Sequence, residues 1–212
     1  MTYFAPLALL IALLLALWFG WRLISERRSL PCPTSLAWLL ENPFTSGYHS
    51  TVVARLELSP GLHVLDAGCG PGLLTTAIAA VTRQGRVLAL DIQPGMIAKA
   101  KARAAKAGLS NIDYLAAPLG RGNLPVSQFD RALLVTVLGE IPDKVAALKE
   151  IRSSLKPGGF LSITEVLPDP HYQSMRKVRA LADQAGLRLR NKTGNLFMFT
   201  INLERPLGEA SN

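Results

Sequence analysis

An alternation of short strand-like runs with helical runs is the feature that most restricts the fold of this chain. The strand-like runs are rich in Val, Leu and Ile, and they occupy residues 63–68, 86–91, 111–116, 129–137 and 159–166. Strands alternating with helices at this spacing predict right-handed βαβ units. The sequence therefore predicts an α/β fold, with a parallel sheet and helices on both of its faces.

The end of the chain has a different pattern. Residues 186–206 contain two strand-like runs joined by Thr193-Gly194-Asn195, a turn sequence typical of a β-hairpin. Because a hairpin reverses the direction of the chain, we expect an antiparallel strand at the edge of the sheet.

The first residues are much more apolar than the rest. The chain of 212 residues is 49% hydrophobic and 18% charged, too apolar for an average soluble domain, and residues 1–21 carry no charged side chain. As a helix, residues 4–24 would be ~31 Å long, which matches the hydrocarbon core of a bilayer, about 30 Å. We therefore expect a retained transmembrane anchor; a cleaved signal peptide and a buried helix are the alternatives.

The charges beside this run predict its orientation. Arg22, Arg27 and Arg28 follow it, and only the amino terminus precedes it, so the positive-inside rule places the rest of the chain in the cytoplasm. Two cysteines provide no disulfide framework, which suits a reducing compartment.

The expected organisation has four parts: an anchor at 1–24, a juxtamembrane linker at 25–42, a globular domain at 43–205 and a tail at 206–212. Thr34 and Ser35 would begin a short linker helix, which either lies in the membrane interface or covers the domain as a lid. This composition excludes collagen-like, disulfide-rich and disordered chains.

A glycine-rich turn follows the first strand directly, in the sequence Asp66-Ala67-Gly68-Cys69-Gly70-Pro71-Gly72. Such a turn lets the backbone approach a ligand closely. A dinucleotide fingerprint needs a small residue where Leu73 stands, and a phosphate-binding Walker loop needs a Gly-Lys-Ser/Thr sequence, which is absent. Because the carboxylate of Asp66 would repel a pyrophosphate, the turn favours a cationic ligand.

Three segments together resemble class I S-adenosylmethionine-dependent methyltransferases. VLDAGCGPG (64–72) resembles the first motif of that family, FDRALLVTVLGEIPD (129–143) its fourth-strand motif, and KPGGFLSITE (156–165) its turn into strand five. The resemblance covers about residues 43–205. It implies methyltransferase activity, S-adenosylmethionine as the cofactor, and a Rossmann-like seven-stranded sheet in the order 3-2-1-4-5-7-6 with the last strand antiparallel.

The resemblance also implies a set of cofactor-binding residues: Asp66, Gly68, Gly70, Gly72, Asp91, Ile92 and Leu138. Asp66 and the glycines would surround the aminoacyl part of the cofactor, and Asp91 would accept hydrogen bonds from its ribose. Ile92 would pack on the adenine and Leu138 would lie beneath the transferable methyl group. Where many relatives carry Gly-Asp-Ala, this chain has Ala116-Ala117-Pro118, so the adenine amine is left to a backbone carbonyl or to Asn123.

The candidates for a general base are Tyr48, Glu140 and His171, with Glu165 and His49 behind them. Ligands bind at the carboxyl ends of strands in open α/β sheets, which favours Glu140, Glu165 and His171. Simpler roles are also open: Tyr48 packing over the cofactor, Glu140 capping the next helix, and His171 as a polar turn residue. The histidines and cysteines lack the spacing of metal ligands, so we expect no metal site.

The net charge of +8 raises the question of partners. One basic cluster comprises Lys99, Lys101, Arg103 and Lys106, and a second comprises Arg176, Lys177 and Arg179. No aromatic platform or recognition module for nucleic acid accompanies them. We expect the first cluster to be a solvated helix face and the second to contact the lipid bilayer.

The sequence thus predicts a methyltransferase on the cytoplasmic face of a membrane, with a lipid or lipophilic small molecule as its acceptor. A protein-methylating or cofactor-sensing module at a membrane complex is the alternative. Neither the acceptor nor the oligomeric state follows from the sequence.

Overall fold

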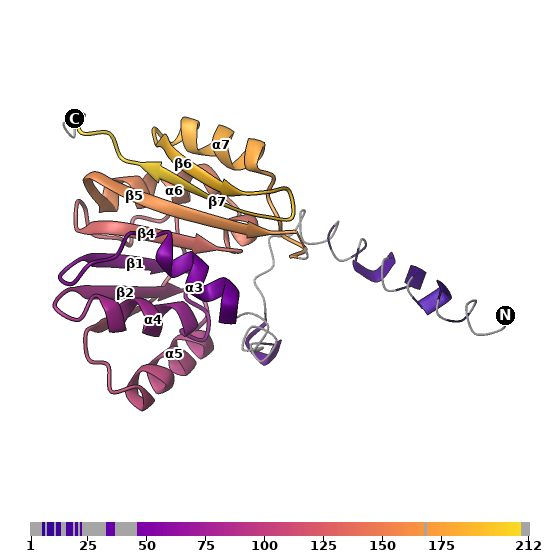
Figure 1. Cartoon of the computed structure of the whole chain (residues 1–212), viewed down its shortest axis with the longest axis horizontal. Helices are drawn as coiled ribbons and strands as arrows, with labels where there is room; N and C mark the ends of the chain where they lie inside the picture. Colours follow the sequence, from indigo (N-terminus) through magenta and orange to yellow (C-terminus); the bar gives the residue numbers. More distant parts are fainter. Residues whose placement is uncertain are drawn as a thin grey trace.

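A seven-stranded sheet with helices on both faces forms the body of the protein (Figure 1). The computed structural model describes residues 6, 8–10, 12, 13, 16–18, 20, 22, 33–36, 46–167 and 169–208, with the backbone alone at 36 and 46–48. The elements are η1 (Thr34–Leu36), α3 (Ser46–Ala54), β1 (His63–Ala67), α4 (Leu73–Val81), β2 (Arg86–Asp91), α5 (Pro94–Lys106), β3 (Ile112–Ala116), β4 (Phe129–Val135), η3 (Leu138–Glu140), α6 (Lys144–Ser154), β5 (Leu155–Val166), α7 (Met175–Gln184), β6 (Arg188–Gly194) and β7 (Met198–Glu204).

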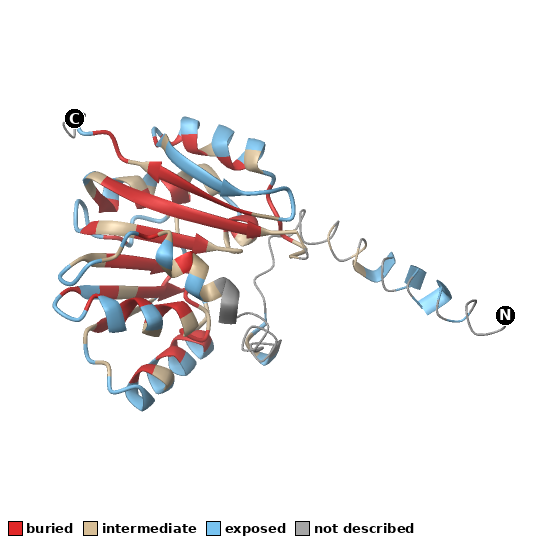
Figure 2. Cartoon of the chain, in the orientation of Figure 1, coloured by how far each residue is buried: buried red, intermediate tan, exposed pale blue. Residues whose placement is uncertain are grey.

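The strand order is β3-β2-β1-β4-β5-β7-β6, which confirms the predicted topology. Strands β1 to β5 pair in parallel, and β7 is antiparallel to both of its neighbours. The hairpin pattern led us to expect the antiparallel strand at the edge of the sheet. Instead, β7 lies between β5 and β6, as the predicted strand order requires. The edge strand is β6, and Figure 2 shows it exposed along almost its whole length.

Each face of the sheet has its own hydrophobic core. Helices α3, α4 and α5 bury side chains such as Val52, Ile78 and Ile97 against one face. Helices α6 and α7 bury Leu148 and Val178 against the other. The central strands are therefore covered on both sides, which explains why they occur in the sequence as nearly continuous apolar runs.

The loops after β4 and β5 bring the ends of these strands close to α6 and α7. Asp143, which directly precedes α6, caps this helix by accepting a hydrogen bond from the amide of Ala146 at 2.9 Å. Glu140 is therefore not the cap, because it lies three residues earlier, in η3. His171 lies in the turn before α7, which begins only after its cap Ser174.

The described positions between residues 6 and 22 are helical. Among the residues that the structure describes, no helix is long and apolar enough to cross a bilayer; much of the expected anchor lies outside them. The linker forms a 3-10 turn at Thr34–Leu36, and the rest of the expected linker helix is also outside the described residues.

Candidate functional site

The turn between β1 and α4 has a backbone that only glycine adopts readily. Gly68, Gly70 and Gly72 have φ angles of 78°, 52° and 83°, in the left-handed region that is costly for other residues. Space is limited as well: a Cβ atom on Gly72 would lie 2.8 Å from the Cα of Ala100, and one on Gly68 would overlap the side chain of Val137. The turn is therefore clamped between α5 and the loop that follows β4.

The end of β2 holds this turn in place. The Oδ2 atom of Asp91 accepts a hydrogen bond from the amide of Gly70 at 3.0 Å, and its Oδ1 atom accepts one from the amide of Gln93 at 2.8 Å. Asp91 is buried. Burial raises the pKa of its carboxyl group, and the two amide hydrogen bonds oppose that increase.

Asp66, on β1, is a second buried acid beside the turn. The hydroxyl of Thr75 donates a hydrogen bond to its Oδ2 atom at 2.6 Å, and no cation in the described part of the chain pairs with it. The pKa of Asp66 is raised to about 6, mainly by burial and in smaller part by the nearby charge of Asp91, while the hydrogen bond from Thr75 opposes the increase. A buried carboxylate without a counter-ion is costly, so this position is suited to a positively charged ligand group.

Arg103 is a functional contact that the sequence analysis missed. Its Nε atom donates a hydrogen bond at 3.0 Å to the carbonyl of Pro71, within the glycine-rich turn. Lys101, from the same cluster, lies over the ring of Tyr114, 5.5 Å from its centroid. Lys99, Lys101 and Lys106 are exposed, as expected for a solvated helix face, whereas Arg103 is half-buried against the turn. The spacing of Ala100 and Arg103 was the available signal, since residues three apart share a helix face.

A chain of contacts leads from the turn to His171. Val137 covers Gly68, and it is followed by the fully buried Leu138 and by Gly139, where a Cβ atom would overlap the carbonyl oxygen of His171. Thr136, at the start of this loop, has a φ of 55°. A positive φ at a β-branched residue stores strain, which is typical of functional sites.

His171 is buried, and two acids lie on one side of its ring. Its Nδ1 atom lies 3.5 Å from Oδ1 of Asp169 and 3.9 Å from Oε1 of Glu140. Its amide also donates a hydrogen bond to Asp169 at 2.6 Å. The Nε2 atom, on the other side of the ring, is buried and has no hydrogen-bond partner among the residues that the structure describes.

Two further side chains beside His171 have unpaired buried atoms. The Oε2 atom of Glu165 accepts a hydrogen bond from the backbone amide of Gln173 at 2.9 Å. The Oε1 atom of Glu165 and the Oε1 atom of Gln173 have no partner in the described part of the chain. Burial raises the pKa of Glu165 to about 8, and Asp169 and Glu140 add to the increase. This carboxyl group is therefore mostly protonated at neutral pH, so it can donate a hydrogen bond.

The remaining candidates are more dispersed. Ile92 directly follows β2 and is 53% exposed. Tyr48 belongs to α3, but its side chain lies outside the described residues. His49, also on α3, is partly buried, and burial lowers its pKa. The side-chain Nδ2 atom of Asn123 donates a hydrogen bond to the carbonyl of Pro118, a contact within the same loop.

Comparison with known proteins assigns this arrangement to a family. Residues 64–159 match a family model described as a methyltransferase domain. The chain is 33% identical over 184 residues to a ubiquinone biosynthesis O-methyltransferase of Xanthomonas euvesicatoria pv. vesicatoria, a match that covers 74% of this chain and 73% of the relative. The chain belongs to the S-adenosylmethionine-dependent methyltransferases. It is an enzyme, and S-adenosylmethionine is its cofactor.

Matches to other relatives cover less of the chain. This chain is 33% identical over 129 residues to a trans-aconitate 2-methyltransferase of Methylobacterium nodulans, a match that covers 60% of this chain and 48% of that enzyme. It spans about half the length, or less, of several curated relatives. The crystal structure of a SAM-dependent methyltransferase from Aquifex aeolicus superposes with a TM-score of 0.75 at 22% identity, covering 82% of this chain and 98% of that one.

Proposed function

We propose that this methyltransferase is anchored to the cytoplasmic face of a membrane and methylates a protonated oxygen of a lipid or lipophilic small molecule. In this proposal Asp66, Gly68, Gly70 and Gly72 bind the aminoacyl part of S-adenosylmethionine, and Asp91 accepts hydrogen bonds from its ribose. The cofactor supplies a methyl group that is already activated, so the protein has to position the acceptor, exclude water and remove a proton.

Features of the cofactor residues fit S-adenosylmethionine. The buried carboxylate of Asp66 has no cation of the described chain beside it, and the cationic aminoacyl end of the ligand would supply that charge. Because Gly68, Gly70 and Gly72 carry no side chains, the turn itself places no side-chain atoms at these positions between its backbone and a ligand. Asp91 uses one lone pair of each oxygen for an amide, so both oxygens keep a second lone pair for a ribose hydroxyl.

The unpartnered Nε2 atom of His171 carries the proposal of an oxygen acceptor. Because Asp169 and Glu140 both lie on the Nδ1 side, they favour a proton on Nδ1. Nε2 then has a free lone pair with which to take the proton of a hydroxyl. A base is needed only if the acceptor arrives protonated, and the name of the Xanthomonas relative describes an O-methyltransferase.

Exposed leucines near the amino terminus support the membrane anchor. Leu9, Leu10, Leu13 and Leu17 are each more than half exposed at helical positions, and they belong to a run that carries no charge before Arg22. Figure 1 shows the described pieces of this segment beyond the end of the sheet where β5 terminates. An acceptor dissolved in the bilayer would thus meet the site at a high effective concentration.

A labelling experiment tests the acceptor class. Full-length protein is incubated with S-adenosylmethionine carrying a radiolabelled methyl group and with native membrane extract, and the label is then measured in the organic phase, in protein and in water-soluble products. We expect the label in the organic phase, in a product that is stable to alkali. This stability distinguishes a methyl ether from a methyl ester, which alkali would hydrolyse. Label in protein instead would support the alternative, a protein-methylating module, and contradict a lipophilic acceptor.

The anchor is tested by changing its charge. Leu10→Lys with Leu13→Lys should release the full chain from washed membranes, because each charge near the centre of a spanning helix costs roughly 2.5–3.5 kcal/mol. Leu207→Lys is the matched control, since Leu207 is 79% exposed near the other end of the chain. If the double variant remains in the membrane fraction, residues 4–24 are not the anchor.

A further inference from the structure

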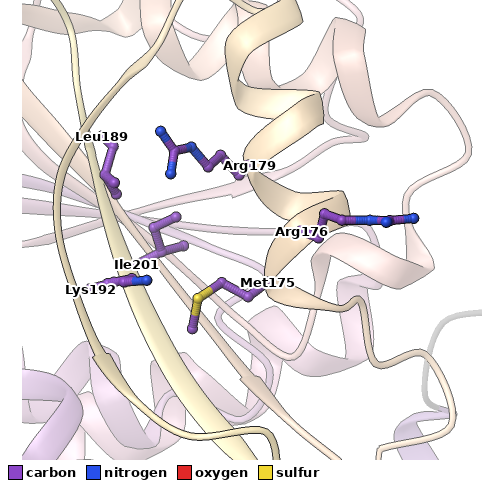
Figure 3. Close-up of a pocket in the computed structure, with 6 residues that line it drawn as sticks. All are labelled: Met175, Arg176, Arg179, Leu189, Lys192 and Ile201. Carbon is purple, nitrogen blue, oxygen red and sulfur yellow. The ribbon is translucent and has the colours of Figure 1, made fainter.

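A hollow between α7 and the β6–β7 hairpin lies outside the methyltransferase site described above (Figure 3). Its volume is about 270 Å³. Met175, Leu189 and Ile201 give it an apolar floor, and Arg176, Arg179 and Lys192 supply its only charged lining. Positive charge around an apolar floor indicates a ligand with an anionic group attached to an apolar body.

The three cations are exposed and have no partner. None of them forms a hydrogen bond or an ion pair with the part of the chain that the structure describes. Figure 3 shows Arg179 extending across the hollow towards β6, whereas Arg176 points away from the strands to the outside. By contrast Arg190, also on β6, pairs with Glu57 at 2.7 Å. Within the described chain Arg190 is thus paired with an acid, whereas the three cations of the hollow are not.

The hairpin carries two exposed apolar side chains beside these cations. Leu196 and Phe197, in the turn after β6, are 69% and 66% exposed. Because β6 runs parallel to β5, the turn after β6 and the loop of His171 after β5 lie at the same end of the sheet, at the carboxyl ends of these strands. In Figure 1 the described pieces of residues 6–22 lie on this side as well. Large apolar groups next to cations are typical of surfaces that enter the membrane interface.

We propose that these residues form a membrane-docking surface for anionic phospholipid. In this basic hairpin surface (Arg176, Arg179, Lys192, Leu196 and Phe197) the cations bind headgroup phosphates, and the two apolar side chains enter the interface. Each cation near an anionic bilayer raises binding about fivefold. When this surface binds the bilayer, the end of the sheet where His171 lies faces the lipid. The inference rests on the proposed function only in placing the enzyme at a bilayer, not in the identity of the acceptor.

Lysine footprinting of the full-length protein tests the docking. The chain is reconstituted into nanodiscs of phosphatidylcholine alone or of phosphatidylcholine mixed with phosphatidylglycerol, and the rate at which an amine reagent acylates each lysine is measured. We expect Lys192 to react several-fold more slowly in the anionic nanodiscs, and this protection to disappear at high salt. Lys106, exposed at the end of α5 on the other face of the sheet, should react equally in both.

Charge variants make the test specific. In Arg179→Glu/Lys192→Glu the lipid-dependent protection of the neighbouring Lys177 should be lost, whereas Lys99→Glu/Lys106→Glu should retain it. Equal labelling of Lys192 in both nanodiscs overturns the proposal, and so does protection of α5 instead. Protection by glycerol 3-phosphate without anionic lipid would also overturn it, since the hollow would then bind a soluble phosphate. If docking fails while methyl transfer to the organic phase persists, the proposed function stands without it.

Discussion

A hydrogen bond of 3.0 Å joins the carboxylate of Asp91 to the backbone amide of Gly70, across the sheet from β2 to the turn after β1. One side chain thus shapes the glycine-rich turn and presents its remaining lone pairs at the same place. The geometry of the turn and the affinity for the cofactor are therefore expected to change together when this residue is replaced.

Asp91→Ala should weaken S-adenosylmethionine binding at least 10-fold to 100-fold, because hydrogen bonds to a charged group contribute about 1.5–3 kcal/mol each. Calorimetric titration of the cofactor measures the loss. Asp113→Ala is the control, since its carboxylate pairs with Arg86 and both side chains are about half exposed. An unchanged affinity in Asp91→Ala would sink the assignment of this carboxylate to the cofactor.

Gly72→Ala separates backbone strain from the clamping of the turn. Gly61 has a similar φ of 88°, but nothing lies within 4 Å of a Cβ atom there, whereas at Gly72 the Cα of Ala100 lies 2.8 Å away. Gly61→Ala should cost roughly 1–2 kcal/mol in unfolding free energy. Gly72→Ala should cost about 1–3 kcal/mol more and should also weaken cofactor binding. Denaturant unfolding measures the stability and calorimetry measures the cofactor affinity. Equal losses in the two variants would show that α5 moves to make room for the added methyl group.

The elements of the sheet were largely predictable from the sequence because its central strands are buried on both faces. The predicted strand at residues 86–91 matches β2 residue for residue. β5 begins at Leu155, earlier than the predicted 159, because the sequence Pro157-Gly158-Gly159 was interpreted as a turn. The hairpin pattern alone placed the antiparallel strand at the edge of the sheet, which was wrong, whereas the strand order implied by the family resemblance placed it correctly between β5 and β6. Local sequence predicts a hairpin, but the place of the hairpin in the sheet depends on the crossover through α7.

The two parts of the site differ in how far the sequence defines them. Asp66, the glycines and Asp91 lie at the ends of neighbouring strands, so their proximity follows from the strand order. The environment of His171 follows only in part, because Asp169 is its neighbour in the same loop, whereas Glu140 and Gly139 reach it from the loop after β4. No local pattern encodes the contacts with Glu140 and Gly139; they arise only when β4 and β5 pair.

Cofactor binding should depend on pH through Asp66. Its pKa of about 6 reflects burial without a counter-ion, and a cationic ligand favours the charged carboxylate and lowers this pKa in the complex. Below about pH 6 the free protein must therefore release a proton on binding, so affinity should fall as pH falls, by up to tenfold per unit, and be level above that value. The dissociation constant measured by calorimetry between about pH 5 and 8 checks this expectation.

Asp66→Asn is the matched variant for the pH dependence. It should bind more weakly at neutral pH, and its affinity should change little between about pH 5 and 7, because the titrating group has been removed. A residual slope would report on Asp91, whose pKa burial also raises. If the wild-type slope survives unchanged in Asp66→Asn, the cationic end of the cofactor does not lie beside this residue.

His171→Asn should separate chemistry from cofactor binding. The Asn side chain retains a donor near the position of Nδ1, so it can still face Asp169, but it has no counterpart of the unpartnered Nε2. Loss of a general base lowers the rate of methyl transfer by roughly 10²–10⁴-fold, and the affinity for S-adenosylmethionine should be unchanged. His63→Asn, at the start of β1, should leave both quantities near the wild-type value. Because a base is dispensable once the acceptor is ionised, raising the pH should restore part of the rate in His171→Asn. A variant that instead loses cofactor affinity or thermal stability along with its rate would show that His171 supports the loop and does not take the proton.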